Sequence, residues 1–216
     1  MAELTFDCID VQPQRYAVSP TLLFRLRIAE LSKTPVHAIA LRCQIRIEPR
    51  RRRYSEHEQQ HLAALFGEPS RWGETLNPIQ FTSVSHLVTS FTGATEVDLP
   101  VPCTYDLEVS AGKYFHALED GMVPLLLLFS GTVFGKGERG FWVDQVPWHK
   151  EAEYQMPVSV WQELMDTYFP NEAWIRLHRD TIDALLRYKA EHAIPTWDAA
   201  MTQLLTTASG TSGVTP

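Results

Sequence analysis

The chain has few cysteines, and their spacing excludes several kinds of site. Only three occur in 216 residues, Cys8, Cys43 and Cys103, and no two of them form a Cys-x-x-Cys pair. This excludes a zinc or iron–sulfur site built from cysteines and gives no indication of a disulfide scaffold. Each cysteine lies in a strand-like stretch, so we expect small buried side chains and no nucleophile.

The sequence also lacks a secretory signal and a membrane span. Its first residues, Met-Ala-Glu-Leu-Thr-Phe-Asp, contain neither a basic segment nor an apolar one. The longest apolar run, residues 123–129, is far too short to cross a bilayer. We therefore expect a cytoplasmic protein without membrane insertion.

A surplus of positive charge is missing as well. The chain has 19 Lys and Arg residues against 26 Asp and Glu residues, and its net charge is −7. Since a general nucleic-acid binder needs a broad basic face, this composition excludes that class. The four consecutive arginines Arg50, Arg51, Arg52 and Arg53 are a local exception. Such a run is typical of a solvated strand end, and it could also contact phosphate or an acidic partner.

Motifs for nucleotide binding and nucleophilic catalysis are absent too. Residues 135–140 are rich in glycine, but no Gly-Lys-Ser/Thr sequence opens a helix there, so they form no P-loop and instead predict a hairpin loop. No Gly-x-Ser-x-Gly elbow occurs. His116 lies close in sequence to Glu119 and Asp120, an arrangement that is more often structural than catalytic. We therefore expect no cofactor.

What the sequence does contain is the alternation of apolar and polar side chains that is typical of β-strands. It is clearest in residues 22–28 and 39–47. The short Ser-Lys-Thr-Pro link between them predicts that these two strands are antiparallel neighbours. We expect further strands at residues 4–11, 84–91, 95–101, 105–109, 123–134 and 141–148. Many short strands with Pro- and Gly-rich joints favour a sandwich.

The pattern becomes helical after Pro157. Trp161, Leu164 and Tyr168 have helical spacing, and we expect two further helices, capped by Asn171 and by Thr196. The predicted class is α+β, an antiparallel immunoglobulin-like β-sandwich with a C-terminal helical extension. Its predicted parts are a sandwich at residues 1–152 with one inserted helix at about 55–67, the extension at 153–206 and a disordered tail at 207–216.

One string resembles a catalytic motif. His57, Glu58 and His61 form the His-Glu-x-x-His pattern of zinc proteases. There the two histidines, one helical turn apart, bind zinc, and the glutamate acts as the general base. A zinc-dependent hydrolase is therefore the alternative function that we weigh.

Three observations favour a structural role for this string. Ser55 and Glu58 have the spacing of a capping box, which gives the glutamate another task. The string occupies the first turns of its helix, and apolar residues follow only after it. Ala64 stands where the extended zinc-protease pattern needs glycine, and no third ligand is nearby in sequence, although His86 and Glu96 stay open as distant candidates.

Several spaced blocks resemble those of an uncharacterised bacterial, mainly actinobacterial, domain family that is often encoded beside NiFe-hydrogenase genes. The blocks are Ile47-Glu-Pro-Arg-Arg-Arg-Arg-Tyr54, Leu65-Phe-Gly-Glu-Pro-Ser-Arg-Trp-Gly-Glu-Thr-Leu76, Lys113-Tyr-Phe-His-Ala-Leu-Glu-Asp-Gly-Met-Val-Pro-Leu125, Phe129-Ser-Gly-Thr-Val-Phe134, Pro157-Val-Ser-Val-Trp161 and Tyr168-Phe-Pro170. The resemblance covers almost the whole chain except the tail. It implies a part in hydrogenase maturation, assembly or electron-transfer organisation. In that family the helix after the tyrosine is usually acidic and does not keep both histidines, which argues further against zinc.

We therefore predict a non-enzymatic accessory or assembly protein whose partner is a hydrogenase subunit or maturation factor. The arginine run and Trp72 are the candidates for partner contact, because Arg and Trp are frequent interface anchors. A chaperone-like binder of unfolded clients is a third possibility. Exposed apolar area on the sheet would favour it.

Overall fold

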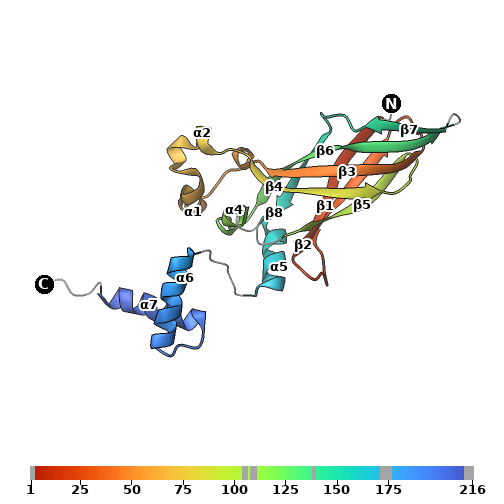
Figure 1. Ribbon diagram of the computed structural model, residues 1–216. Coiled ribbons are helices and arrows are strands. Elements are labelled where there is room, and N and C mark those ends of the chain that lie inside the picture. The colour runs from red at the N-terminus through yellow and green to blue at the C-terminus, as the bar shows by residue number, and fades with distance from the viewer. Residues whose placement is uncertain (1–2, 104–106, 108–110, 138–139, 171–176, 212–216) are drawn as a thin grey trace. The chain divides into compact units, whose positions relative to one another are not determined.

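The computed structural model describes residues 3–103, 107, 111–137, 140–170 and 177–211, and its chain divides into two compact units (Figure 1). The first unit comprises Met1–Asn171 and the second comprises Glu172–Pro216. Each is described by itself below.

The first unit contains two antiparallel sheets. Sheet A has three strands in the order β1-β2-β5, namely β1 (Leu4–Pro13), β2 (Thr21–Glu30) and β5 (Ala94–Pro102). Sheet B has the order β4-β3-β6-β7, and β8 pairs with the first half of the long strand β6. Its strands are β3 (Val36–Ile47), β4 (Ile79–Val88), β6 (Met122–Gly137), β7 (Gly140–Gln145) and β8 (Glu151–Pro157).

The alternation in residues 22–28 and 39–47 correctly identified two strands and their buried faces. In β2 the side chains of Leu22, Phe24, Leu26 and Ile28 are buried, and β3 follows the same rule. The predicted mixed α and β class with antiparallel sheets is confirmed. The strand expected at residues 105–109 lies outside the described residues apart from Leu107. Strand β8 was not predicted.

The prediction that residues 22–28 and 39–47 are neighbours in one sheet is wrong. β2 pairs with β1 and β5, whereas β3 pairs with β4 and β6. The link at residues 32–35 therefore carries the chain from sheet A to sheet B. This lets both apolar faces enter one core, where Phe6 of β1 stacks on Phe129 of β6 with ring centroids 4.4 Å apart.

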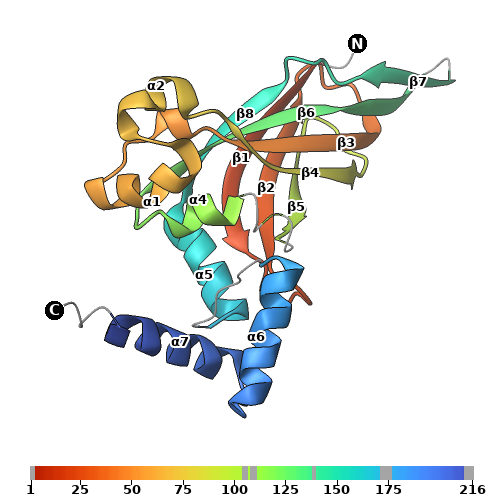
Figure 2. The ribbon, with the colours of Figure 1, turned by 60° about the vertical axis from the view of Figure 1, so that its left-hand side comes forward.

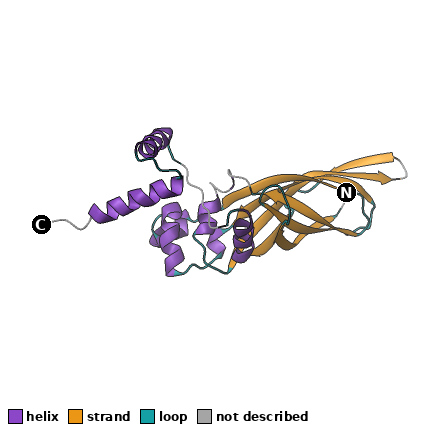
Figure 3. Cartoon of the chain, turned by 90° about the horizontal axis from the view of Figure 1, so that it is seen from below, coloured by secondary structure: helices purple, strands orange, loops and turns teal. Residues whose placement is uncertain are grey.

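The helices of the first unit lie together at the end of the sheets away from β7 (Figures 1 and 2). They are α1 (Glu56–Phe66), α2 (Trp72–Thr75), α4 (Lys113–His116) and α5 (Val158–Tyr168). Figure 3 shows the strands from below, extending away from these helices. Single 3-10 turns at Pro49–Arg51 and Pro69–Arg71 connect β3 to α1 and α1 to α2.

The contacts divide the chain after residue 171, and not after residue 152 as we expected from the sequence. β8 pairs with β6, and Trp161 of α5 stacks on Phe115 with centroids 4.3 Å apart. The hydroxyl of Tyr168 also donates to the carbonyl of Ala17, at 2.9 Å. Residues 153–171 therefore belong to the first unit, called the β-rich unit below, and not to a separate extension.

The second unit contains α6 (Arg179–Glu191) and α7 (Trp197–Thr211). Thr196 caps α7 as predicted, since its Oγ1 accepts from the backbone N–H of Ala199 at 3.2 Å. The helix continues to Thr211, past the start of the tail expected at residue 207. The expected cap at Asn171 and residues 212–216 lie outside the described residues. No helix within the described ranges is long and apolar enough to cross a membrane.

Candidate functional site

The arginine run begins where β3 ends, and three of its four side chains face the solvent. Arg50 donates from Nη2 to the carbonyl of Gly73 at 2.6 Å. Arg51 forms an exposed ion pair with Glu153, with 2.5 Å between Nη1 and Oε1. Arg53 is exposed and forms no ion pair within the part of the chain that the structure describes.

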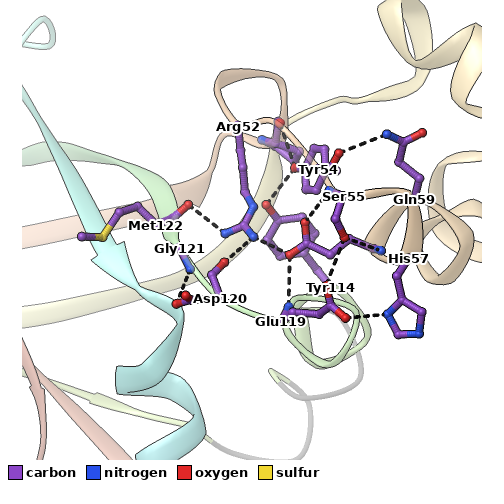
Figure 4. Close-up of polar contacts among 12 residues, drawn as sticks. Arg52, Tyr54, Ser55, His57, Gln59, Tyr114, Glu119, Asp120, Gly121 and Met122 are labelled. Carbon is purple, nitrogen blue, oxygen red and sulfur yellow. Dashed lines mark hydrogen bonds and ion pairs between the residues drawn. The ribbon is translucent and has the colours of Figure 1, made fainter.

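Arg52 points the other way, into the protein (Figure 4). Only 8% of its side chain is exposed. Its Nη2 donates to the Glu58 carboxylate and to the carbonyl of Asp120, and its Nη1 donates to the carbonyl of Met122 at 3.0 Å. Its Nε is buried without a hydrogen-bond partner among the described residues. Arg52 thus links the N-terminal end of α1 to the loop before β6.

Arg52 and Glu58 are the two centres of one hydrogen-bonded cluster. One carboxylate oxygen accepts from the backbone N–H of Ser55 at 3.0 Å, while the Ser55 hydroxyl oxygen accepts from the backbone N–H of Glu58, which confirms the predicted capping box. The other oxygen accepts from Arg52 and, at 3.1 Å, from the backbone N–H of Glu119. With 5% of its side chain exposed, Glu58 has both oxygens occupied inside the protein.

Two tyrosines extend the cluster toward the core. The hydroxyl of Tyr54 donates to the carbonyl of Pro49 at 2.8 Å, which uses its only proton. The hydroxyl of Tyr114, 2.9 Å away, must therefore donate to Tyr54. Burial raises the pKa of Tyr114 and of Tyr54, so both phenols are neutral at physiological pH and act as structural links.

The histidines of the zinc-like string lie on the exposed side of α1. The Nε2 atoms of His57 and His61 are 3.2 Å apart. Nδ1 of His57 is 2.8 Å from Oε1 of Glu119, which comes from the loop after α4. The second oxygen of Glu119 accepts from the Ser55 hydroxyl at 3.1 Å. The pair is thus solvent-accessible and is held from one side by a carboxylate.

This geometry separates the three residues of the string. His57 and His61 face the solvent, whereas Glu58 is buried and bound to three donors. A general base must reach a metal-bound water, whereas Glu58 is buried with both of its oxygens hydrogen-bonded inside the protein. No group of three or more His, Cys, Asp or Glu side chains among the described residues is arranged to hold a metal. His86 and Glu96 lie on β4 and β5, outside α1.

Trp72 is buried as well. Its indole N–H donates to the carbonyl of Gly67 at 2.9 Å, and its ring packs edge-to-face on Tyr54 and Phe66. Of the five residues predicted to contact a partner, Arg52 and Trp72 are thus engaged inside the fold. Arg50, Arg51 and Arg53 are accessible, and only these three remain candidates for partner contact.

Sequence patterns did not identify an exposed apolar surface on sheet B. Ala38, Phe134 and Val143 stand opposite one another on β3, β6 and β7, and Ala40 stands opposite Leu87 of β4. Leu87 is 65% exposed and Val143 is 62% exposed. Together with Phe141 these residues form the apolar face, defined as Ala38, Ala40, Leu87, Phe134, Phe141 and Val143. The apolar residues at outward positions of these strands could have indicated this surface. Their adjacency is visible only once the strand register is known.

Cys43 and Cys103 are buried as predicted, whereas Cys8 is half-buried. None is paired, and burial raises the pKa of each of the thiols of Cys8, Cys43 and Cys103 to about 12. Because the thiolate is the reactive form, these raised pKa values disfavour a nucleophilic role at neutral pH.

Comparison with known proteins identifies a family and little else. No curated protein matches the chain. Among solved structures, a beta-glucosidase from Kluyveromyces marxianus shares 8% identity over 72% of this chain, with a TM-score of 0.27. Beta-glucosidase 3B from Thermotoga neapolitana shares 11% identity over 71% of this chain, with a TM-score of 0.26. The chain spans only 15% and 17% of the lengths of these enzymes, and likeness at such scores carries no functional argument.

A family model described as Family of unknown function (DUF6084) matches residues 1–213, nearly the entire chain. This protein therefore belongs to the DUF6084 family.

Proposed function

We propose that this protein is a non-enzymatic accessory or assembly protein that binds a protein partner through the outer face of sheet B. The observation that carries the proposal is the apolar face, six residues that extend across four strands. Large exposed apolar patches with a polar rim are typical of protein-binding surfaces.

The surroundings of the apolar face support the same function. Lys136 and His37 border Phe141, and Arg42 lies on β3 two residues beyond Ala40, so the patch has a polar rim. β7 pairs only with β6 among the described strands, which leaves one edge of β7 unpaired. A free edge strand offers backbone N–H and C=O groups to an extended segment of a partner.

The three accessible arginines form a second region through which the protein would contact its partner. Arg50, Arg51 and Arg53 are exposed, in a protein with a net charge of −7. Arginine is enriched at interfaces because its planar guanidinium binds carboxylates with two hydrogen bonds. An acidic segment of the partner is the group that this region would bind.

The scaffold that we propose for this task is an immunoglobulin-like sandwich. The order β1-β2-β5 beside β3-β6-β7 corresponds to strands A-B-E and C-F-G of that fold, with β4 next to β3. The stacking of Phe6 on Phe129 supports face-to-face packing of the two sheets. We also propose a cytoplasmic location, because a reducing compartment would keep the three free thiols unpaired.

The partner that we propose is a hydrogenase subunit or a hydrogenase maturation factor. This rests on the resemblance of the spaced aromatic blocks to a family often encoded beside NiFe-hydrogenase genes. A chaperone-like role, in which the apolar face holds unfolded segments, is the second candidate, and the exposure of Leu87, Phe141 and Val143 favours it.

Affinity purification from the source organism tests the proposal. One variant carries Leu87→Ser and Val143→Ser, and a second carries Arg50→Ser, Arg51→Ser and Arg53→Ser. The matched controls are Ile9→Ser, another exposed apolar strand residue, and the double variant Arg15→Ser, Arg27→Ser. We expect wild type and controls to recover the same hydrogenase components and both test variants to lose them.

The possible outcomes separate the parts of the proposal. Equal recovery of the same partners with every variant would overturn both contact regions. Recovery of a defined partner unrelated to hydrogenase would overturn only the identity of the partner. Capture of many unfolded clients through the apolar face would favour the chaperone-like role.

A further inference from the structure

We propose that His57 and His61 form a two-histidine clamp for a divalent transition-metal ion of the Cu²⁺, Ni²⁺ or Zn²⁺ class, with Glu119 as its positioning residue. The proposal concerns the exposed side of α1 and does not depend on the partner-binding function. It also differs from a hydrolytic zinc site, because Glu58 takes no part in it.

The two ring nitrogens approach each other closely. Residues four apart on a helix are neighbours on its surface, and here the Nε2 atoms are 3.2 Å apart (ring centroids 4.5 Å). Without an ion, the N–H of one ring can donate to the lone pair of the other at this distance. A metal ion that displaces this hydrogen would bind both nitrogens from the same position. Both rings are exposed, so an ion in solution can reach them.

A carboxylate holds His57 from the side opposite His61 in its ring. Nδ1 of His57 lies 2.8 Å from Oε1 of Glu119 and donates its hydrogen to that oxygen (Figure 4). This fixes the tautomer with the lone pair on Nε2, the atom that faces His61. Metal-binding histidines commonly donate their other N–H to a carboxylate in this way, which orients the ring and makes it a stronger ligand.

The residues that support the two histidines are themselves held in place. The backbone N–H of Glu119 donates to the buried Glu58, and the other oxygen of Glu119 accepts from Ser55. The capping box fixes the first turn of α1, and Arg52 binds Glu58 from the other side. The clamp is therefore preorganised before an ion binds, which lowers the entropic cost of binding.

The donor set defines the class of ion. Imidazole nitrogen suits copper, nickel and zinc, whereas magnesium and calcium require oxygen ligands. With two protein ligands and no third His, Cys, Asp or Glu in place among the described residues, water or a partner's side chain would complete the coordination. Affinity should follow the general order for divalent metals, with Cu²⁺ bound most tightly.

Calorimetric titration of the untagged, full-length protein with Cu²⁺, Ni²⁺ and Zn²⁺ salts tests the clamp. We expect one ion per chain and the lowest Kd for Cu²⁺. His57→Ala and His61→Ala should each raise the Kd for Cu²⁺ by about tenfold or more, and Glu119→Gln by about tenfold. The matched control is His149→Ala, an exposed histidine distant in sequence from α1, which should leave the Kd unchanged.

Paramagnetic resonance of the Cu²⁺ complex gives a readout that a purely structural role would not change. Wild type should show two coordinated nitrogens, and each single histidine variant should show one fewer. A Kd and a nitrogen count that stay the same in both histidine variants would overturn the clamp. If Glu119→Gln, folded by circular dichroism, bound Cu²⁺ as tightly as wild type, the positioning role of Glu119 would be overturned.

Discussion

Arg52 and Glu58 form an ion pair that is almost entirely buried, with 8% and 5% of their side chains exposed and 2.5 Å between Nη2 and Oε1. The pair joins two features that are prominent in the sequence, the arginine run and the His-Glu-x-x-His string. Because both residues are occupied by each other and by nearby backbone groups, neither is available to a partner or a substrate. Their role is to hold the start of α1 against the loop before β6.

Removing one member of this pair should strongly destabilise the protein. Arg52→Met leaves the Glu58 carboxylate buried without its cation, and Glu58→Gln removes the charge that compensates Arg52. We expect each to lower the free energy of unfolding by about 3–5 kcal/mol, and the double variant to be less destabilised than the sum of the two. Urea denaturation followed by circular dichroism measures all three.

The exposed pair of Arg51 and Glu153 is the control for this double-mutant cycle of Arg52 and Glu58. Its side chains are 48% and 60% exposed, so Arg51→Met and Glu153→Gln should show a coupling of only about 0–1 kcal/mol. If the Arg52–Glu58 coupling were equally small, the buried pair would not be what holds α1 in place.

Glu30 should make stability depend on pH in the acid range. It is buried at the end of β2, where its oxygens accept from the backbone N–H groups of Glu3 and Thr34 and from the Ser32 hydroxyl at 2.6–3.1 Å. Burial alone would raise the pKa of this carboxyl, but these hydrogen bonds outweigh it and hold the pKa below its ordinary value of 4.5. The unfolded chain therefore takes up the proton first as the pH falls.

The contribution of Glu30 is consequently complete above about pH 4.5 and is lost as the pH falls through the lower pKa of the folded state. Glu30→Gln should be less stable than wild type by about 1–2 kcal/mol at pH 7, and the difference should shrink toward pH 3. Glu163→Gln, at an exposed position of α5, is the control. A difference between Glu30→Gln and wild type that stays constant from pH 7 to pH 3 would contradict this assignment.

The boundary between the two units can be tested by truncation. A chain of residues 1–171 retains both sheets and α5, so we expect its free energy of unfolding to match that of the β-rich unit in the full chain within about 0.5 kcal/mol. A chain of residues 1–152 loses most of β8 together with the buried side chains of Met156, Val158, Trp161 and Leu164. Each of these contributes about 1.5–3 kcal/mol, which together approaches the whole stability of a domain.

The shorter chain should therefore fail to fold cooperatively in circular dichroism and show no protected amides in hydrogen exchange. A folded 1–152 chain would instead support the boundary expected from the sequence. An unfolded 1–171 chain would show that the second unit is needed by the first.

Local patterns identified much of the fold because they report local physics. Alternation in residues 22–28 and 39–47 marked two strands and their buried faces, since successive side chains of a strand point to opposite sides. The spacing of Ser55 and Glu58 correctly predicted the capping box. The partner of each strand was not local information, and the short link at residues 32–35 suggested a wrong pairing because a turn between two strands does not specify whether they share a sheet.

The candidate site was less predictable for the same reason. In the sequence Arg50, Arg51, Arg52 and Arg53 are equivalent, yet only Arg52 is buried, because Glu58 and the carbonyls of Asp120 and Met122 meet it there. Glu119 is 62 residues from His57, and no local pattern relates them. Trp72 was predicted at an interface from its residue type, whereas packing against Tyr54 and Phe66 places it in the core.

The sequence by itself determined several strands of the β-rich unit with their buried faces, and the helix start at Ser55, since these depend on residues close in the chain. Only the tertiary structure decided which strands pair, which arginine is buried and that Glu58 is separated from His57 and His61. Each of these depends on groups that are distant in sequence and become neighbours when the core closes. In the folded protein, Glu58 of the string that resembles a catalytic motif is therefore in a buried ion pair with Arg52, whereas His57 and His61 are exposed.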